Sequence, residues 1–192
     1  MRGLRRMAEL LRAVAAVVFS TVVPGLLSLP VLAQPVHALP QKKGSSSGLA
    51  IPRFVSLKAD RVNLRSGPGT EYPTSWVFSR AGLPVEVLNE FEAWRQVRDA
   101  EGSTGWVLYS MLSGRRTALV LPWELKKGQS PPSTPLRRDD SESSRPVAIV
   151  EAGVIADISK CDGRWCLVVI GDYRGYIEQN KLWGVYEGEV ID

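Results

Sequence analysis

Residues 82–112 read GLPVEVLNEFEAWRQVRDAEGSTGWVLYSML, and their spacing of glycines and aromatics recurs at residues 153–182, GVIADISKCDGRWCLVVIGDYRGYIEQNKL. The matched positions are Gly82, Trp94, Val97, Gly105, Trp106 and Leu112 in the first copy, and Gly153, Trp165, Val168, Gly175, Tyr176 and Leu182 in the second. The offset between the copies falls from 71 to 70 residues, as one residue lost from a loop would produce. Two copies are too few for a solenoid, so the pattern predicts two small, similar domains in tandem.

Both copies consist of short β-forming runs separated by turns that contain Gly, Pro, Asn or Asp, as in small all-β barrels or sandwiches. We place the first domain at residues 53–117 and the second at residues 118–192, whose first strand is expected at 118–121. The segment 126–145 is dense in Pro, Ser and charge, and we expect a long loop inside the second domain there.

The first 33 residues have the features of a cleavable signal peptide. Four arginines precede an apolar stretch at 13–23, and Ala33 marks a plausible cleavage point, with a second after Ala38. The alternative is an uncleaved membrane anchor, although the apolar stretch is shorter than the roughly 20 residues that a spanning helix needs. Residues 34–52 are rich in Ser, Gly, Pro and Lys and predict a flexible tether.

The formal net charge of +4 comes largely from this leader. Residues 34–192 hold 20 basic and 19 acidic side chains, with the basic pairs scattered. A nearly neutral chain of mixed charge lacks the basic surface typical of nucleic-acid-binding proteins, so we expect no nucleic-acid partner.

The only two cysteines, Cys161 and Cys166, flank Asp162 and Gly163, a strong signal for a tight hairpin. Opposite positions in such a hairpin lie within reach of a disulfide, which persists in an exported protein. We therefore predict a Cys161–Cys166 disulfide. The alternatives are a reduced pair or a redox-active pair, although the spacing differs from the two-residue redox motif.

Residues 59–70, ADRVNLRSGPGT, carry a resemblance to a known family, together with Trp94, Val97 and the Gly105–Trp106 pair. They closely resemble the bacterial SH3-like (SH3b) domain, and the resemblance covers essentially all of 53–112. The second copy resembles it less strongly, with Leu136–Arg138 aligned to Leu64–Ser66. The tandem is similar to small exported SH3-domain proteins of Gram-negative bacteria. This resemblance implies two SH3-like β-barrels in the periplasm or cell envelope, with no stable membrane span after signal cleavage.

The second copy departs from the family signature where the first has Ser66–Gly69. It has Arg138–Ser141 there, and Pro135 replaces the asparagine. A ligand site inherited from the family is therefore in doubt in the second domain, which is expected either to stabilise the first or to carry a separate, charged site.

The candidate ligand-binding residues are Asn63, Arg65, Tyr72, Trp94 and Trp106. Asn63 and Arg65 alternate with apolar residues and should point away from the core, where they either brace the following loop or bind a ligand. The resemblance implies that the three aromatics form an apolar floor for an extended peptide or a glycan-linked peptide. The alternative is that Trp94 and Trp106 fill the core of a small barrel.

The sequence argues against an enzyme. Its only histidine, His37, lies in the leader or tether, so the folded domains have no His base and no His for a metal site. We expect no catalytic residue, no metal and no cofactor. The remaining carboxylates of interest are expected at solvent-facing positions, as ordinary surface charges: Glu86, Glu90, Glu92 and Asp99.

Three hypotheses of function remain. The first is a non-enzymatic module that binds cell-wall peptide or glycan through the first barrel, as the resemblance implies. The second is an adaptor that binds another envelope protein. The third is a mainly structural envelope protein. The sequence leaves the oligomeric state open.

Overall fold

The computed structural model describes residues 42–192. The predicted signal peptide at 1–33, both candidate cleavage sites and the first part of the predicted tether lie outside these residues. Within 42–192, no helix is long and apolar enough to cross a membrane. Residues 42–192 belong to one compact unit.

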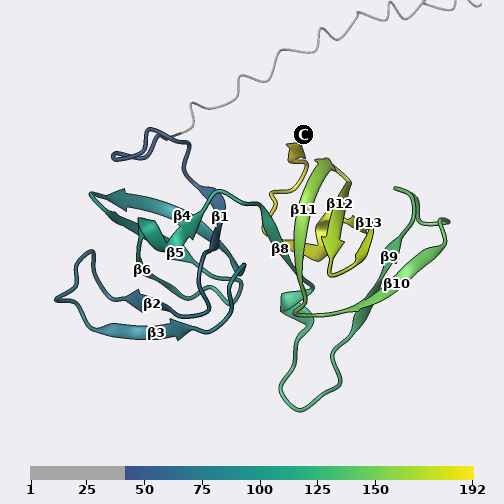
Figure 1. Ribbon diagram of the computed structural model, residues 1–192, viewed down its shortest axis with the longest axis horizontal. Coiled ribbons are helices and arrows are strands. Elements are labelled where there is room, and N and C mark those ends of the chain that lie inside the picture. The colour runs from purple at the N-terminus through teal and green to yellow at the C-terminus, as the bar shows by residue number, and fades with distance from the viewer. Residues whose placement is uncertain (1–41) are drawn as a thin grey trace, which may run out of the picture. The chain divides into compact units, whose positions relative to one another are not determined.

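The first domain is a seven-stranded antiparallel sheet (Figure 1). Its strands are β1 Arg53–Leu57, β2 Val62–Arg65, β3 Thr74–Phe78, β4 Pro84–Phe91, β5 Trp94–Arg98, β6 Thr104–Leu108 and β7 Leu112–Ser113. They are hydrogen-bonded in the order β3-β2-β6-β5-β4-β1-β7.

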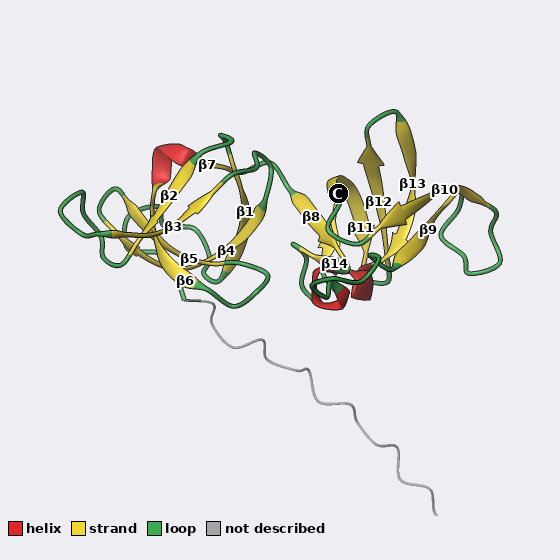
Figure 2. Ribbon diagram, turned by 90° about the horizontal axis from the view of Figure 1, so that it is seen from below, coloured by secondary structure: helices red, strands yellow, loops and turns green. Residues whose placement is uncertain are grey.

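The second domain repeats this order strand for strand, as β10-β9-β13-β12-β11-β8-β14. Its strands are β8 Thr117–Val120, β9 Ser133–Arg137, β10 Pro146–Glu151, β11 Ile155–Asp162, β12 Trp165–Ile170, β13 Tyr173–Glu178 and β14 Leu182–Trp183, with β15 Val190–Ile191 added beside β11. The only helices between residues 42 and 192 are short 3-10 turns (Figure 2): η1 Tyr109–Met111, η2 Pro122–Glu124 and η3 Gln179–Lys181. The predicted all-β tandem is confirmed.

Each domain has its own apolar core, built from alternate residues of its strands. In the first domain the core includes Val62, Leu64, Val97 and Val107, each at most 2% exposed. Because side chains alternate between the two faces of a strand, the residues between them are held on the outer face of the sheet.

The glycine of the repeated glycine–aromatic pair is required by packing. A Cβ added to Gly105 would lie 2.6 Å from Leu64 Cγ and 2.8 Å from the Arg65 carbonyl oxygen. One added to Gly175 would lie 2.8 Å from Leu136 Cγ and 2.5 Å from the Arg137 carbonyl oxygen. The same close approach of two strands therefore recurs in both domains.

The segment 126–145 is not one continuous loop, because β9 runs through it from Ser133 to Arg137. Thr134 and Leu136 alternate into the interior of the second domain, at 2% and 0% exposure. The surrounding Pro, Ser and charged residues conceal this short alternation in the sequence. The domain boundaries themselves stay predictions.

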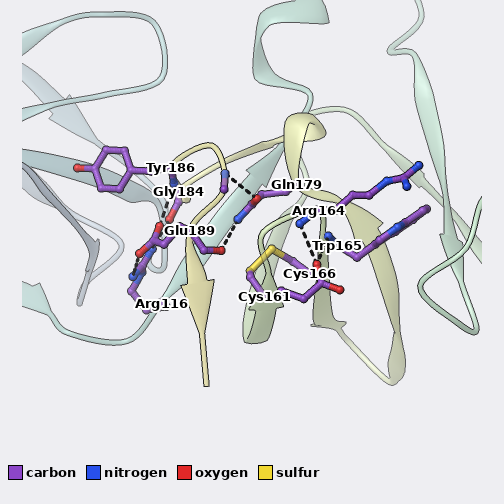
Figure 3. Close-up of a disulfide and its surroundings, with 11 residues drawn as sticks. Arg116, Cys161, Arg164, Trp165, Cys166, Gln179, Gly184, Tyr186 and Glu189 are labelled. Atoms are coloured by element: carbon purple, nitrogen blue, oxygen red, sulfur yellow. Dashed lines mark hydrogen bonds and ion pairs between the residues drawn. A yellow bond between two sulfur atoms is a disulfide. The ribbon is translucent and has the colours of Figure 1, made fainter. Parts of the chain in front are cut away.

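The predicted Cys161–Cys166 disulfide is confirmed (Figure 3). The two cysteines are directly opposite each other on β11 and β12, with Cα atoms 4.1 Å apart. In the turn between them, Asp162 Oδ1 accepts hydrogen bonds from the backbone N–H groups of Trp165 and Arg164, at 2.7 and 2.8 Å. These bonds lower the pKa of the Asp162 carboxyl.

Candidate functional site

Four of the five candidate residues share the outer face of the sheet β2-β6-β5. Asn63 and Arg65 alternate with core residues on β2, as Trp94 does on β5 and Trp106 on β6. Arg65 is directly opposite Trp106, and Trp94 is directly opposite Leu108. Both tryptophans are half-buried and lie outside the apolar core of the first domain.

A groove of about 210 Å³ runs along this face, and we call it the Trp94 groove. It is lined by Arg61, Val62, Asn63, Arg65, Thr70, Trp94, Leu108 and Met111. The lining combines apolar side chains from β5, β6 and η1 with polar side chains from β2 and from the residues next to it. The structure therefore brings Asn63, Arg65 and Trp94 together in one concave site.

Arg65 braces the loop that follows β2. Its Nη1 donates hydrogen bonds to the carbonyl oxygens of Thr70 and Tyr72, at 3.1 and 2.6 Å. In the same loop the backbone N–H of Ser66 donates to the carbonyl oxygen of Pro73 at 3.1 Å. The guanidinium thus holds one rim of the groove in place while also lining it.

Tyr72 and Trp106 are outside the groove lining. The Tyr72 ring lies against Gly67, so closely that a Cβ at Gly67 would overlap the ring. Trp106 continues the outer face next to Arg65, one strand away from Trp94. Tyr72 therefore supports the loop, and Trp106 extends the surface beside the groove.

Five lining residues were not among the candidates from the sequence: Arg61, Val62, Thr70, Leu108 and Met111. A signal was present for two of them. Arg61 is two residues before Asn63 and Leu108 two after Trp106, so simple strand alternation puts both on the outer face. Met111 lies on η1, whose approach to the groove depends on the chain path after β6.

The corresponding face of the second domain is built on the same register, but its tryptophan is buried. Arg137 is opposite Tyr176, as Arg65 is opposite Trp106, and Arg137 Nη1 donates to the Ser144 carbonyl oxygen at 2.7 Å. Trp165, the counterpart of Trp94, is only 4% exposed. Glu142, in the loop after β9, pairs with Arg164 beside it at 2.9 Å.

The expectation that Glu86 and Glu90 are solvent-facing is wrong. They are 3% and 4% exposed. Glu86 accepts hydrogen bonds from the Arg98 guanidinium and from the hydroxyl of Tyr186, the latter at 2.9 Å. Strict alternation puts both residues on the outer face of β4. Glu86 is on that face, opposite Arg98, and is covered by Tyr186. The register of β4 and β5 shifts between Val87 and Asn89, which turns Glu90 to the other side, opposite Arg95.

Glu90 is covered by residues from the predicted tether. Its carboxylate accepts hydrogen bonds from the backbone N–H groups of Ser46 and Ser47, from the Ser47 hydroxyl and from Arg53. Burial by itself raises the pKa of Glu90, but the bonds from Ser47, Arg53 and Ser46 outweigh it and lower the pKa to about 2. The carboxylate is therefore ionised and fully committed to structure.

Glu92 and Asp99 both lie in turns between adjacent strands. Glu92 is exposed, with a positive φ of 47° in the β4–β5 turn. Asp99 Oδ1 accepts hydrogen bonds from the backbone N–H groups of Glu101 and Ser103, at 3.0 and 2.8 Å, in the β5–β6 turn. Across residues 42–192, no group of three or more His, Cys, Asp or Glu side chains is arranged to hold a metal ion.

The sequence matches the family described as bacterial SH3 domain twice, at residues 58–114 and 130–184, which together make up more than half of the chain. No curated protein sequence matches the chain. Among solved structures, NlpC2 from Trichomonas vaginalis is similar at 16% identity and a TM-score of 0.30, over 69% of this chain and 48% of that one. NlpC1 from the same organism is similar at 17% identity and a TM-score of 0.30, over 73% and 48%.

An NlpC/P60 family protein from Bacillus cereus ATCC 10987 is similar at 12% identity and a TM-score of 0.29, over 68% of this chain and 55% of that one. The chain spans about half the length of these three structures.

Proposed function

Because this chain belongs to the bacterial SH3 domain family, which it matches in both domains, we propose that it is an exported, non-enzymatic binding module of the cell envelope. Its first domain recognises cell-wall peptide, alone or linked to glycan, through the Trp94 groove. One observation carries this proposal: Trp94 is half-buried and lines a groove in the first domain, whereas its counterpart Trp165 in the second is only 4% exposed.

The Trp94 groove has the chemistry of a peptide-binding surface. A half-buried indole offers a flat apolar contact with few rotamers to restrict, and Leu108 and Met111 extend that contact. Asn63 and Arg61 also line the groove, where their side chains offer hydrogen-bond donors to main-chain carbonyls of an extended peptide.

The proposal is tested by retention on purified peptidoglycan. We expect the wild-type protein to be retained, and Trp94→Ala to lower its affinity by about tenfold or more, since removing one buried aromatic contact commonly costs at least about 1.4 kcal/mol of binding. Trp123→Ala is the matched control, because Trp123 is an exposed tryptophan of η2, outside the groove.

Thermal unfolding of both variants separates lost binding from lost folding. A folded Trp94→Ala protein that is retained as well as the wild type contradicts the proposal. So does a wild-type protein that is not retained at all.

The non-enzymatic part of the proposal is supported by the state of the buried carboxylates. Glu86 and Glu90 are each paired with arginine, so neither is available as a general acid or base. We expect purified peptidoglycan to give the same fragment profile with and without prior incubation with the protein. New fragments, lost on substitution of a groove residue, would overturn this expectation.

A second candidate, an adaptor for another envelope protein, is favoured by the edge strands. β3 and β10 end the two sheets and expose large apolar side chains, with Trp76 at 60% and Ile149 at 64%. Such edges can pair with an extended segment of another chain. This candidate predicts that Trp76→Lys or Ile149→Lys releases a co-purifying envelope protein while retention on peptidoglycan is unchanged.

A further inference from the structure

The lining of the Trp94 groove is positively charged. It holds two guanidinium groups, Arg61 and Arg65, and no Asp or Glu side chain. The two acids adjacent in sequence to lining residues, Asp60 and Glu71, are both outside the lining, and Asp60 Oδ1 accepts a hydrogen bond from the backbone N–H of Ala81 at 3.0 Å. The charge of the groove is therefore not balanced by a carboxylate of its own lining.

The two arginines differ in the hydrogen bonds that they make within the protein. Arg65 Nη1 holds the Thr70 and Tyr72 carbonyl oxygens and fixes the rim of the groove. Arg61 is exposed and makes no hydrogen bond or ion pair with a side chain or backbone group of residues 42–192. Its guanidinium has no protein partner among these residues, so all of its donors are available for bidentate recognition of an anion, whereas Arg65 has Nη1 committed to the loop.

Three polar side chains form a row at alternate positions along β2: Arg61, just before the strand, and Asn63 and Arg65, within it. Successive members of such a row are about 6.6 Å apart, since a strand rises about 3.3 Å per residue. An extended peptide presents its own alternate side chains at the same repeat, so a ligand lying along β2 can meet Arg61 and the Trp94 floor together.

We propose that the Trp94 groove selects extended peptides that carry a carboxylate, and that Arg61 binds this carboxylate while Trp94, Leu108 and Met111 contact the neighbouring apolar part of the ligand. This inference rests on the proposed function and specifies its ligand. The carboxylate is either an acidic side chain of the peptide or its C-terminus.

The experiment compares purified peptidoglycan before and after its carboxyl groups have been converted to amides. We expect amidation to lower the affinity of the wild-type protein about tenfold, as loss of a charge-assisted bidentate contact would. Arg61→Gln should show a similar loss on untreated peptidoglycan and no further loss on the amidated form. Arg174→Gln, which removes an exposed arginine of the second domain, is the control for bulk charge and should bind like the wild type.

Competition with three synthetic peptides identifies the source of the carboxylate. Ala-Glu-Lys-Ala carries both carboxylates, Ala-Gln-Lys-Ala only the C-terminal one, and the C-terminal amide of Ala-Glu-Lys-Ala only the side-chain one. If Arg61 binds the side-chain carboxylate, Ala-Gln-Lys-Ala should compete more weakly than Ala-Glu-Lys-Ala for the wild type, and equally well for Arg61→Gln. If Arg61 binds the C-terminus, the C-terminal amide should show this pattern instead.

Two results overturn the inference. One is an amidation that leaves wild-type affinity unchanged. The other is an Arg61→Gln loss that is the same on untreated and amidated peptidoglycan. If either occurs while Trp94→Ala still lowers the affinity for peptidoglycan, the proposed function stands and only its carboxylate specificity fails. If the wild type is not retained, the proposed function fails as well.

Discussion

At the scale of single residues, the carboxylate of Glu90 ties the chain before β1 to the first domain. The Ser47 hydroxyl and the Ser47 and Ser46 N–H groups donate to it at 2.6, 2.8 and 3.0 Å. Arg53 pairs with it at 2.8 Å and Arg95 at 3.3 Å. These contacts neutralise a charge that would otherwise be costly to bury.

The first prediction concerns stability in acid. Because the pKa of Glu90 is about 2 in the folded protein and ordinary carboxyls titrate near 4.5, its contribution to the free energy of unfolding is complete above pH 4.5. It is lost as the pH falls from about 4.5 to about 2, by roughly 3 kcal/mol. We expect Glu90→Gln to lower the free energy of unfolding at pH 7 and to flatten its dependence on pH in this window.

Urea unfolding between pH 2 and pH 7 measures this effect. Glu151→Gln, which changes an exposed carboxyl on β10, is the control and should follow the wild type. Equal pH dependence of the wild type and Glu90→Gln would show that Glu90 does not have the role assigned to it.

Sequence alternation placed Asn63 and Arg65 correctly on the outer face, whereas the groove position of Trp94 was expected from the family resemblance, with the barrel core as the alternative. Alternation fails at Glu90, because the register of β4 and β5 shifts between Val87 and Asn89 and turns Glu90 to the side of Arg95. Glu90 is covered by Ser46 and Ser47, more than 40 residues away in the chain. Such long-range contacts leave no periodic signal, which is why the burial of Glu90 was not predicted.

At the scale of strands, the close approach of β2 and β6 makes Gly105 a sensitive position. We predict that Gly105→Ala lowers the free energy of unfolding by about 1–3 kcal/mol, because the added methyl group would collide with Leu64 and with the Arg65 carbonyl. Gly114→Ala is the matched control, since an added Cβ there has open space. Thermal or urea unfolding distinguishes them, and a Gly105→Ala protein as stable as Gly114→Ala would contradict the packing described.

The disulfide gives a second prediction at this scale. It closes a short loop between adjacent strands, for which loop entropy predicts about 2 kcal/mol of stabilisation. We expect the double substitution Cys161→Ala and Cys166→Ala to lower the free energy of unfolding by at least that amount, since both side chains are also buried. Urea unfolding of the variant measures the loss. Stability equal to the wild type would mean that the bond does not constrain the hairpin.

The presence of these strands was predictable where the sequence repeats itself. The recurring glycines and aromatics identified the β5–β6 and β12–β13 hairpins, because each position has a packing requirement that recurs. β9 was hidden, because Thr134 and Leu136 are its only inward-facing residues and a proline lies between them. Two inward residues are too few to reveal a period of two.

At the scale of the whole molecule, the two domains share one strand order but differ in what their outer faces expose. We predict that Trp165→Ala lowers the free energy of unfolding by about 3 kcal/mol, since it removes a buried side chain, and leaves the affinity for peptidoglycan unchanged where the protein is folded. Trp94→Ala should show the opposite pattern, with a larger effect on binding than on folding. Equal losses of binding in the two variants would contradict this division between the domains.

The sequence predicted a difference between the domains from the altered loop at 138–141. The structure supplies its physical form: Trp165 is covered and Glu142 pairs with Arg164. The sequence does not show this difference, because the half-buried Trp94 and the buried Trp165 occupy the same position in the repeat.

The most direct test of the central claim is to locate the bound ligand on the protein. Soluble peptidoglycan fragments titrated into isotopically labelled protein should shift the NMR resonances of residues around the Trp94 groove, chiefly Arg61–Arg65, Trp94, Leu108 and Met111. The shifts should follow one binding isotherm and disappear in Trp94→Ala. Shifts confined to β3, to β10 or to the second domain, or no shifts at saturating fragment, would contradict the claim that this groove is the binding site.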